Sequence, residues 1–157
     1  KIQMKMRNIK FIILISLVSC SIDNNLTIDK IPDKWLLLTN TDSGFVHISH
    51  FDRGSTILTI QNSKSVKLIF DQSVIEFSIE KLDSTTSNSF LYSGMYTFDA
   101  RLKGEKPQKG RLKFKLIDQK EELASWTIEF NGEIVIKEYF SSSRKINDYP
   151  IVDFAKK

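Results

Sequence analysis

The chain of 157 residues is long enough for one domain with a full hydrophobic core, and its single cysteine, Cys20, excludes a disulfide framework within it. The formal net charge is +4, but four of the basic residues and none of the acidic ones precede Cys20. Removing those four from the 23 basic residues leaves 19, which equals the 19 acidic residues, so the charge gives no indication of nucleic-acid binding.

The first segment of the chain is typical of an export signal. Four basic residues lie within the first ten, and an apolar run over residues 11–18 follows them. A positively charged start and a short apolar run are the first two regions of a signal peptide. The run is well short of the roughly 20 apolar residues that a membrane-spanning helix requires. We therefore expect residues 1–19 to be removed from the mature protein.

The motif Leu17-Val18-Ser19-Cys20 resembles the lipobox of bacterial lipoprotein precursors. In that family the cysteine thiol is diacylated, and a signal peptidase cuts just before it. The resemblance implies acyl chains, such as palmitate, on Cys20 and a tether over residues 20–30. Ser21, in place of an aspartate, implies delivery to the outer membrane of the cell envelope. The alternative is an ordinary secretory signal that ends near a lone cysteine.

Residues 31–157 are expected to form a single all-β domain. Apolar and polar residues alternate with a period of two, and β-branched and aromatic residues are enriched. The links are short and rich in turn residues, and none is long enough for a helical crossover between parallel strands. The expected strands cover residues 34–39, 45–51, 56–61, 65–70, 74–82, 89–102, 111–118, 122–130 and 133–140.

Two turns lead to expectations about strand register. A two-residue loop at Asp71-Gln72 places Leu68 opposite Ile75, with both side chains on one apolar face. At Asn131-Gly132 we prefer a three-residue loop that ends on a left-handed Gly132 with a bulge, because it places Trp126 opposite Ile136. A two-residue loop there would place Trp126 opposite Lys137 instead.

A meander of eight to ten strands has to hide its edges, either in a closed barrel or in a sandwich. The opening Asp33-Lys34-Trp35 resembles the Gly-x-Trp of lipocalin-like barrels, in which the tryptophan plugs the closed end. Asp33 replaces the glycine, and Arg144 lies in the region of the partner arginine of that family. We prefer a closed lipocalin-like barrel to a sandwich. The alternative for Trp35 is an ordinary core position.

The chain has few residues suited to catalysis, so we expect no enzymatic activity and no cofactor. Its two histidines, His47 and His50, lie an odd number of residues apart on one expected strand and therefore point to opposite faces. Asp52 shares a face with His50, but two ligands form only a weak zinc site, and no metal site is expected. Glu138 shares a face with apolar residues, and we place it at a barrel rim rather than in the core.

The segment from Arg101 to Lys115 is locally basic. Within it, Arg111, Lys113 and Lys115 alternate with apolar residues, which places three cations on the outer face of one strand. We interpret the stripe as a solvated face that resists aggregation. Contact with anionic headgroups or glycans is the alternative.

The expected strand over residues 89–102 carries a candidate ligand site. It places aromatic side chains on one face around a central glycine, which marks a bend or a close approach of another group. These residues should point inward with two aromatic residues from the following strands, and either line a pocket or form plain barrel core. The candidate residues are Phe90, Tyr92, Gly94, Tyr96, Phe98, Phe114 and Trp126.

The sequence therefore favours a noncatalytic, monomeric outer-membrane lipoprotein whose partners are the membrane, through the lipid on Cys20, and a small apolar ligand or lipid. The alternative function is binding of an envelope protein, as an inhibitor, an immunity factor or an assembly component. A barrel with an apolar lumen favours the first function. A barrel filled by side chains, with an exposed apolar patch, favours the second.

Overall fold

The computed structural model describes residues 24–49, 56–70, 73–98 and 106–153. Cys20 and the segment before it lie outside the described residues, and so do His50 and Asp52. The same holds for the ends of two expected strands, over residues 50–51 and 99–102, and for the first part of the basic segment.

Strands account for most of the described chain. Alternation with a period of two sets their positions, and nine of them coincide with expected strands to within a few residues. The strands are β1 (Lys34–Thr41), β2 (Gly44–Ser49), β3 (Ile57–Gln61), β4 (Ser65–Phe70), β5 (Ser73–Thr85), β6 (Ser89–Phe98), β7 (Gln108–Asp118), β8 (Leu123–Phe130), β9 (Glu133–Ser142) and β10 (Ile151–Asp153). Two short 3-10 helices, η1 (Ile28–Lys30) and η2 (Ile146–Asp148), complete the described elements. No helix in these ranges is long and apolar enough to cross a membrane.

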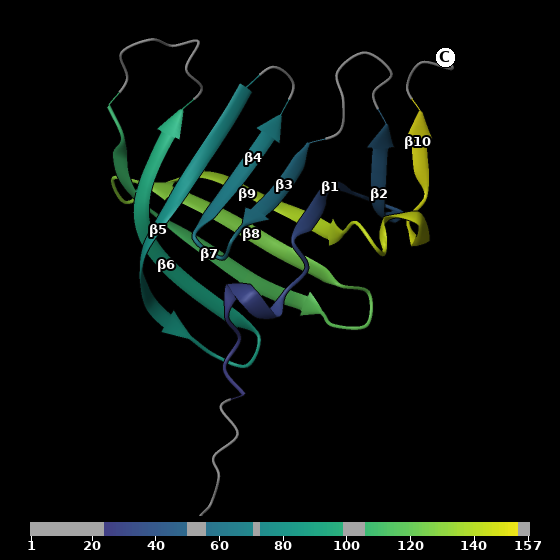
Figure 1. The fold of residues 1–157 in the computed structure, drawn as a ribbon. Coiled ribbons are helices and arrows are strands. Elements are labelled where there is room, and N and C mark those ends of the chain that lie inside the picture. Colours follow the sequence, from purple (N-terminus) through teal and green to yellow (C-terminus); the bar gives the residue numbers. More distant parts are fainter. Residues whose placement is uncertain (1–23, 50–55, 71–72, 99–105, 154–157) are drawn as a thin grey trace, which may run out of the picture.

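Eight strands form a closed antiparallel barrel, which confirms the preference for a barrel over a sandwich (Figure 1). The order around the wall is β1, β3, β4, β5, β6, β7, β8 and β9, and β9 pairs with β1 to close it. Closure leaves these strands with few unpaired edges. The side chains that alternate inward form one continuous apolar core.

The segment before β1 covers one end of the barrel (Figure 1). Leu26 N donates to Thr86 O at 2.7 Å, which fastens this segment to the turn between β5 and β6. Ile28 in η1 is buried in the core cluster, and so is Trp35 at the start of β1. Trp35 has no exposed surface, and its indole N–H donates to Pro32 O at 2.7 Å. This is the closed end of the barrel.

β1 takes part in two different structures along its length. Its first half pairs with β3 and β9, up to the pair Leu38↔Tyr139. Its second half leaves the wall and pairs with β2 from Thr39 onward. β2 in turn pairs in parallel with β10, so these two strands lie outside the barrel. The sequence predicted neither this departure nor the parallel strand β10, which has only three residues.

The register of the hairpin formed by β4 and β5 is the expected one. Leu68 pairs with Ile75, and Val66 pairs with Phe77. All four side chains are buried in the core. The expected two-residue loop, together with the apolar face of each strand, therefore predicted this register correctly.

The register predicted for β8 and β9 is wrong. Asn131 and Gly132 both have positive φ, of 49° and 85°, which is the geometry of a two-residue hairpin turn. A register shift in β9 between Ile134 and Ile136 then places Trp126 opposite Glu138. The bulge therefore lies within β9 and not at the turn. It sends Ile134 outward, where 60% of its surface is exposed.

Candidate functional site

The seven residues predicted to line a ligand site gather inside the barrel. Six of them are buried, and Phe98 is half-buried. Phe90, Phe114 and Trp126 form one inward row across β6, β7 and β8, because they pair in register. Their function as ligand contacts remains a prediction, but their inward orientation follows from this pairing and burial.

The space beside Gly94 is occupied by another side chain. A Cβ atom added to Gly94 would lie 2.0 Å from the backbone oxygen of Ser78 and 2.8 Å from the ring of Phe77. Gly110 pairs with Gly94, and its added Cβ would lie 2.4 Å from the ring of Tyr96. The close approach of another group, one of the two alternatives expected at Gly94, is therefore present. The two glycines allow aromatic rings to pack directly on the backbone of the wall.

Aromatic rings continue this packing toward the closed end. Phe90 stacks on Phe114 with ring centres 4.9 Å apart, and Phe114 meets Trp126 edge to face at 4.8 Å. Trp35 lies against both Phe114 and Trp126. Edge-to-face and offset contacts are the arrangements that aromatic rings prefer. This part of the barrel is packed core and leaves little room for a ligand.

Tyr96 belongs to the same packing but carries a hydroxyl. Its ring has no exposed surface and lies 4.5 Å from the ring of Phe77, and its hydroxyl donates to Arg111 O at 2.7 Å. Burial raises the pKa of Tyr96, and the negative charge of Glu129 raises it further. The hydroxyl therefore stays protonated and acts as a structural hydrogen-bond donor.

A cavity opens where β1 leaves the wall. We call it the mouth pocket. Its volume is about 250 Å³. The last pair between β1 and β9 is Leu38↔Tyr139, so the inward residues of β9 before this point have no β1 neighbour in the wall. The mouth pocket is lined by Leu37, Thr56, Leu68, Phe70, Ile136, Glu138 and Phe140.

The mouth pocket has apolar walls and few polar groups. The side chains of Thr56 and Glu138 supply those groups, and the other lining residues are aliphatic or aromatic. Glu138 is exposed, as expected for a rim position. A carboxylate beside apolar walls accepts hydrogen bonds from a ligand hydroxyl or amine. The sequence did not indicate this pocket, because its lining comes from separated segments whose neighbours depend on the departure of β1.

His47 lies outside the barrel on β2. Its backbone N–H donates to Pro150 O at 2.9 Å, just before the parallel pairing with β10 begins. The side chain is half-buried, and this burial lowers the pKa of His47. Within the described ranges, no group of three or more histidine, cysteine, aspartate or glutamate side chains could hold a metal ion.

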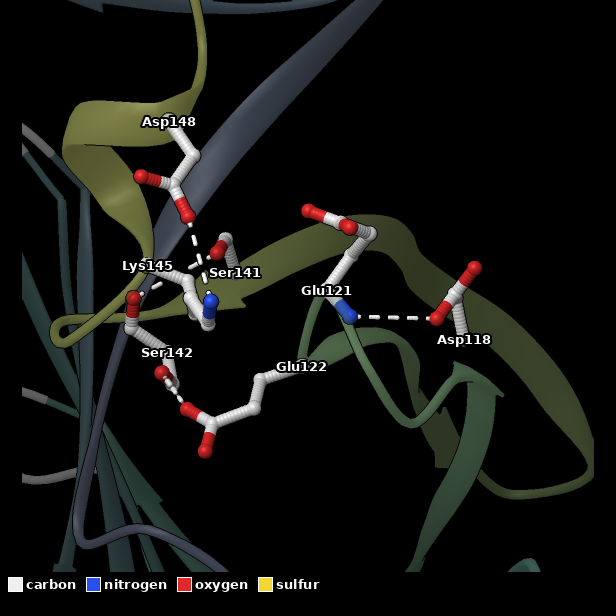
Figure 2. Close-up of polar contacts among 7 residues, drawn as sticks. All are labelled: Asp118, Glu121, Glu122, Ser141, Ser142, Lys145 and Asp148. Atoms are coloured by element: carbon white, nitrogen blue, oxygen red, sulfur yellow. Dashed lines mark hydrogen bonds and ion pairs between the residues drawn. The ribbon is translucent and has the colours of Figure 1, made fainter.

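Polar side chains also gather at the closed end, around the end of β9 (Figure 2). Ser142 has no exposed surface, and its hydroxyl donates to the carboxylate of Glu122. The backbone oxygen of Glu122, a residue with a positive φ of 47°, also accepts the backbone N–H of Ser142. Lys145 Nζ, just before η2, lies 3.3 Å from Oδ2 of Asp148, the last residue of η2. Because Ser142 is inaccessible, we interpret this cluster as a structural clamp between the β7–β8 turn and β9.

Comparisons of this chain with protein-family models, with curated proteins and with solved structures find no match. The functional interpretation therefore depends on the geometry of the barrel and on the residues described above.

Proposed function

We propose that this protein is a noncatalytic lipoprotein of the outer membrane whose lipocalin-like barrel binds a small apolar molecule, or the end of an acyl chain, in the mouth pocket. The observation that carries the proposal is the apolar pocket with a single carboxylate at its rim, in a barrel whose core is packed with aliphatic and aromatic side chains. Ligand pockets typically combine apolar walls with a few polar groups.

The size of the mouth pocket limits the ligand. Its volume of about 250 Å³ is slightly below the range of roughly 300–1,000 Å³ that is typical of small-molecule sites. A ligand of this size is a compact ring system or a short aliphatic segment. Glu138 favours a ligand that carries a hydroxyl or an amine near its apolar part, because a carboxylate accepts hydrogen bonds and attracts positive charge.

Ile136→Trp should fill the mouth pocket and weaken ligand binding. Ile136 is half-buried and lines the pocket, so a larger ring at this position occupies the space of the ligand. We expect the affinity for the neutral fluorophore N-phenyl-1-naphthylamine to fall at least about tenfold, equivalent to about 1.4 kcal/mol. A fluorescence titration of the purified full chain measures this affinity.

The matched control is Ile134→Trp, which makes the same substitution in the same strand. Ile134 is 60% exposed and does not line the mouth pocket, so this variant should bind the fluorophore as the unmodified protein does. Far-ultraviolet circular dichroism verifies that both variants keep the barrel. If the two folded variants bind the fluorophore equally well, the mouth pocket is not the binding site.

The proposed lipid anchor is supported by the lipobox-like motif Leu17-Val18-Ser19-Cys20 and by the absence of any other cysteine. Cys20→Ala removes the only thiol that can be acylated. We expect this variant, expressed in a bacterium with the lipoprotein pathway, to appear in the soluble fraction or as an unprocessed precursor. Fractionation and intact mass measure the outcome. A variant that is still processed, and that stays on the membrane after an alkaline wash, would contradict the anchor.

Binding of an envelope protein is the second candidate function, and the edge formed by β10 favours it. β10 is the last strand in the described sheet order, so its outer edge pairs with no other described strand. Ile151 on this edge is 61% exposed. An exposed strand edge can receive a strand from a partner protein. Chemical cross-linking in intact cells, with a reactive group placed at residue 151, would detect such a partner.

A further inference from the structure

The outer face of β7, β8 and β9 carries rows of residues that lie side by side across the three strands. In the central row, Lys113 pairs with Thr127, and Thr127 pairs with Lys137. Both lysines are exposed, whereas Thr127 between them is only 7% exposed. A hydroxyl-bearing residue therefore lies at the bottom of a shallow channel with an ammonium group on either side.

Neighbouring rows extend the positive charge along β7. Arg111 and Lys115 lie two residues before and after Lys113, and both are exposed on the same face. They pair with Glu129 and Ser125 of β8, respectively. We call the residues of these three rows the basic face. Glu129 is the only acidic residue in these three rows, which contain four basic residues.

The basic face is hollowed rather than flat. One hollow of about 250 Å³ has Lys113, Lys115 and Lys137 around it and Ser125 and Thr127 at its base. A second hollow of about 360 Å³ adjoins it at Glu129 and is lined by Lys109 and Arg111. The long side chains of β7 and β9 rise on either side of the shorter side chains of β8. This geometry leaves space for a compact anionic group between the two strands.

The cations of the basic face are available for a ligand. Within the described part of the chain, Arg111, Lys113, Lys115 and Lys137 form no ion pair. Two exposed aliphatic residues, Ile134 and Val135, lie beside them at the start of β9, with 60% and 53% of their surfaces exposed. Cations beside exposed aliphatic side chains are typical of protein surfaces that rest on an anionic bilayer.

We propose that the basic face binds the phosphate group of an anionic lipid headgroup, with the phosphate between Lys113 and Lys137 over Thr127. A phosphate oxygen can accept hydrogen bonds from both ammonium groups and from the threonine hydroxyl. Ile134 and Val135 then face the bilayer interface. This proposal depends on neither the lipid on Cys20 nor the mouth pocket.

The test is co-sedimentation of the purified full chain with vesicles of phosphatidylcholine alone, and of phosphatidylcholine mixed with phosphatidylglycerol. Every protein in this test carries Cys20→Ala, so that no acyl chain anchors it to the vesicles. Binding to the first vesicles measures any contribution of the apolar N-terminal segment. We expect phosphatidylglycerol to strengthen binding of the chain that keeps all its lysines. The double variant Lys113→Gln/Lys137→Gln should lose about 25-fold of this added affinity, at roughly fivefold for each lysine.

The matched control is Lys34→Gln/Lys64→Gln, which removes the same charge from exposed positions in β1 and in the β3–β4 turn. It should keep most of the phosphatidylglycerol-dependent binding, since these residues lie outside the basic face. An equal loss in both double variants would show that only net charge matters, and would overturn the site. Binding of free glycerol phosphate that requires Lys113 and Lys137, without any effect of phosphatidylglycerol in vesicles, would overturn the membrane assignment.

Discussion

Gly94→Ala is expected to unfold the barrel, or to lower its thermal midpoint by about 10 °C or more. The added methyl group would lie 2.0 Å from the backbone oxygen of Ser78, and a backbone atom can move only if the wall of the barrel moves with it. Overpacking of a filled core costs roughly 1–3 kcal/mol and more where the backbone must shift, and about 3 kcal/mol corresponds to a decrease of roughly 10 °C in a domain of this size.

The direction of this change in stability is informative, because a glycine in a strand usually lowers the stability of a protein. A Gly→Ala change that fits without strain stabilises a protein by roughly 0.4–1 kcal/mol. Thermal unfolding of the purified protein, followed by far-ultraviolet circular dichroism, measures the midpoint. The control Thr97→Ala changes an exposed position on the same strand and should leave it within a few degrees.

A second variant separates the two obstacles beside Gly94. Phe77→Leu removes the ring that lies over the glycine but leaves the Ser78 oxygen in place. We therefore expect the double variant Gly94→Ala/Phe77→Leu to be no more stable than Gly94→Ala alone. A return to the stability of Phe77→Leu would show that only the ring opposes the added methyl group. Native stability of Gly94→Ala itself would show that the wall does not approach this closely.

The surroundings of Gly94 could be predicted from the sequence only in part. Alternation identified β6 and the inward direction of Phe90, Tyr92 and Tyr96, because side chains in a strand point to opposite faces in turn. The glycine predicted a bend or the close approach of another group, but not which group this is. The ring that lies over Gly94 belongs to Phe77 of β5, which pairs with Tyr96, whereas the partner of Gly94 is Ile79. Phe77 is therefore a diagonal neighbour of Gly94, and such a contact depends on how two strands pair, which the alternating pattern within one strand does not specify.

The register of β8 and β9 could not be read from alternation for a different reason. Ile134, Val135 and Ile136 are consecutive and all apolar, so either of two registers places an apolar residue inside. The turn residues decide between them. Asn131 and Gly132 both adopt positive φ and form a two-residue turn, and the bulge in β9 then restores Ile136 to the inner face. Asn-Gly is the strongest short sequence signal for a two-residue turn. The structure follows this signal and not the expected pairing of Trp126 with Ile136.

The mouth pocket depends on a feature that no local pattern specifies. β1 was expected to run only from residue 34 to 39, and the structure continues it to Thr41, outside the wall and paired with β2. The pocket exists because Ile136 and Glu138 are left without a β1 neighbour. The aromatic core could therefore be predicted from the sequence, whereas the cavity beside it required the complete topology.

Trp35→Ala is expected to destabilise the barrel by about 3–5 kcal/mol, the range typical of a buried tryptophan reduced to alanine. Trp35 has no exposed surface. Its ring centre lies 5.5 Å from that of Phe114 and 6.1 Å from that of Trp126. Its loss leaves a cavity at the closed end, beneath the segment that carries η1. Urea unfolding followed by far-ultraviolet circular dichroism measures the change in the free energy of unfolding.

The two tryptophans of the chain provide a sharper comparison, because both are almost fully buried but differ in their hydrogen bonds. The indole N–H of Trp35 donates to Pro32 O at 2.7 Å, whereas that of Trp126 has no acceptor among the described residues. A buried donor without a partner costs roughly 1–3 kcal/mol. Trp126→Phe removes this cost, and Trp35→Phe instead leaves the Pro32 carbonyl without its donor. We expect Trp35→Phe to be more destabilising by about 1–3 kcal/mol, and an equal or larger loss in Trp126→Phe would contradict this account of the core.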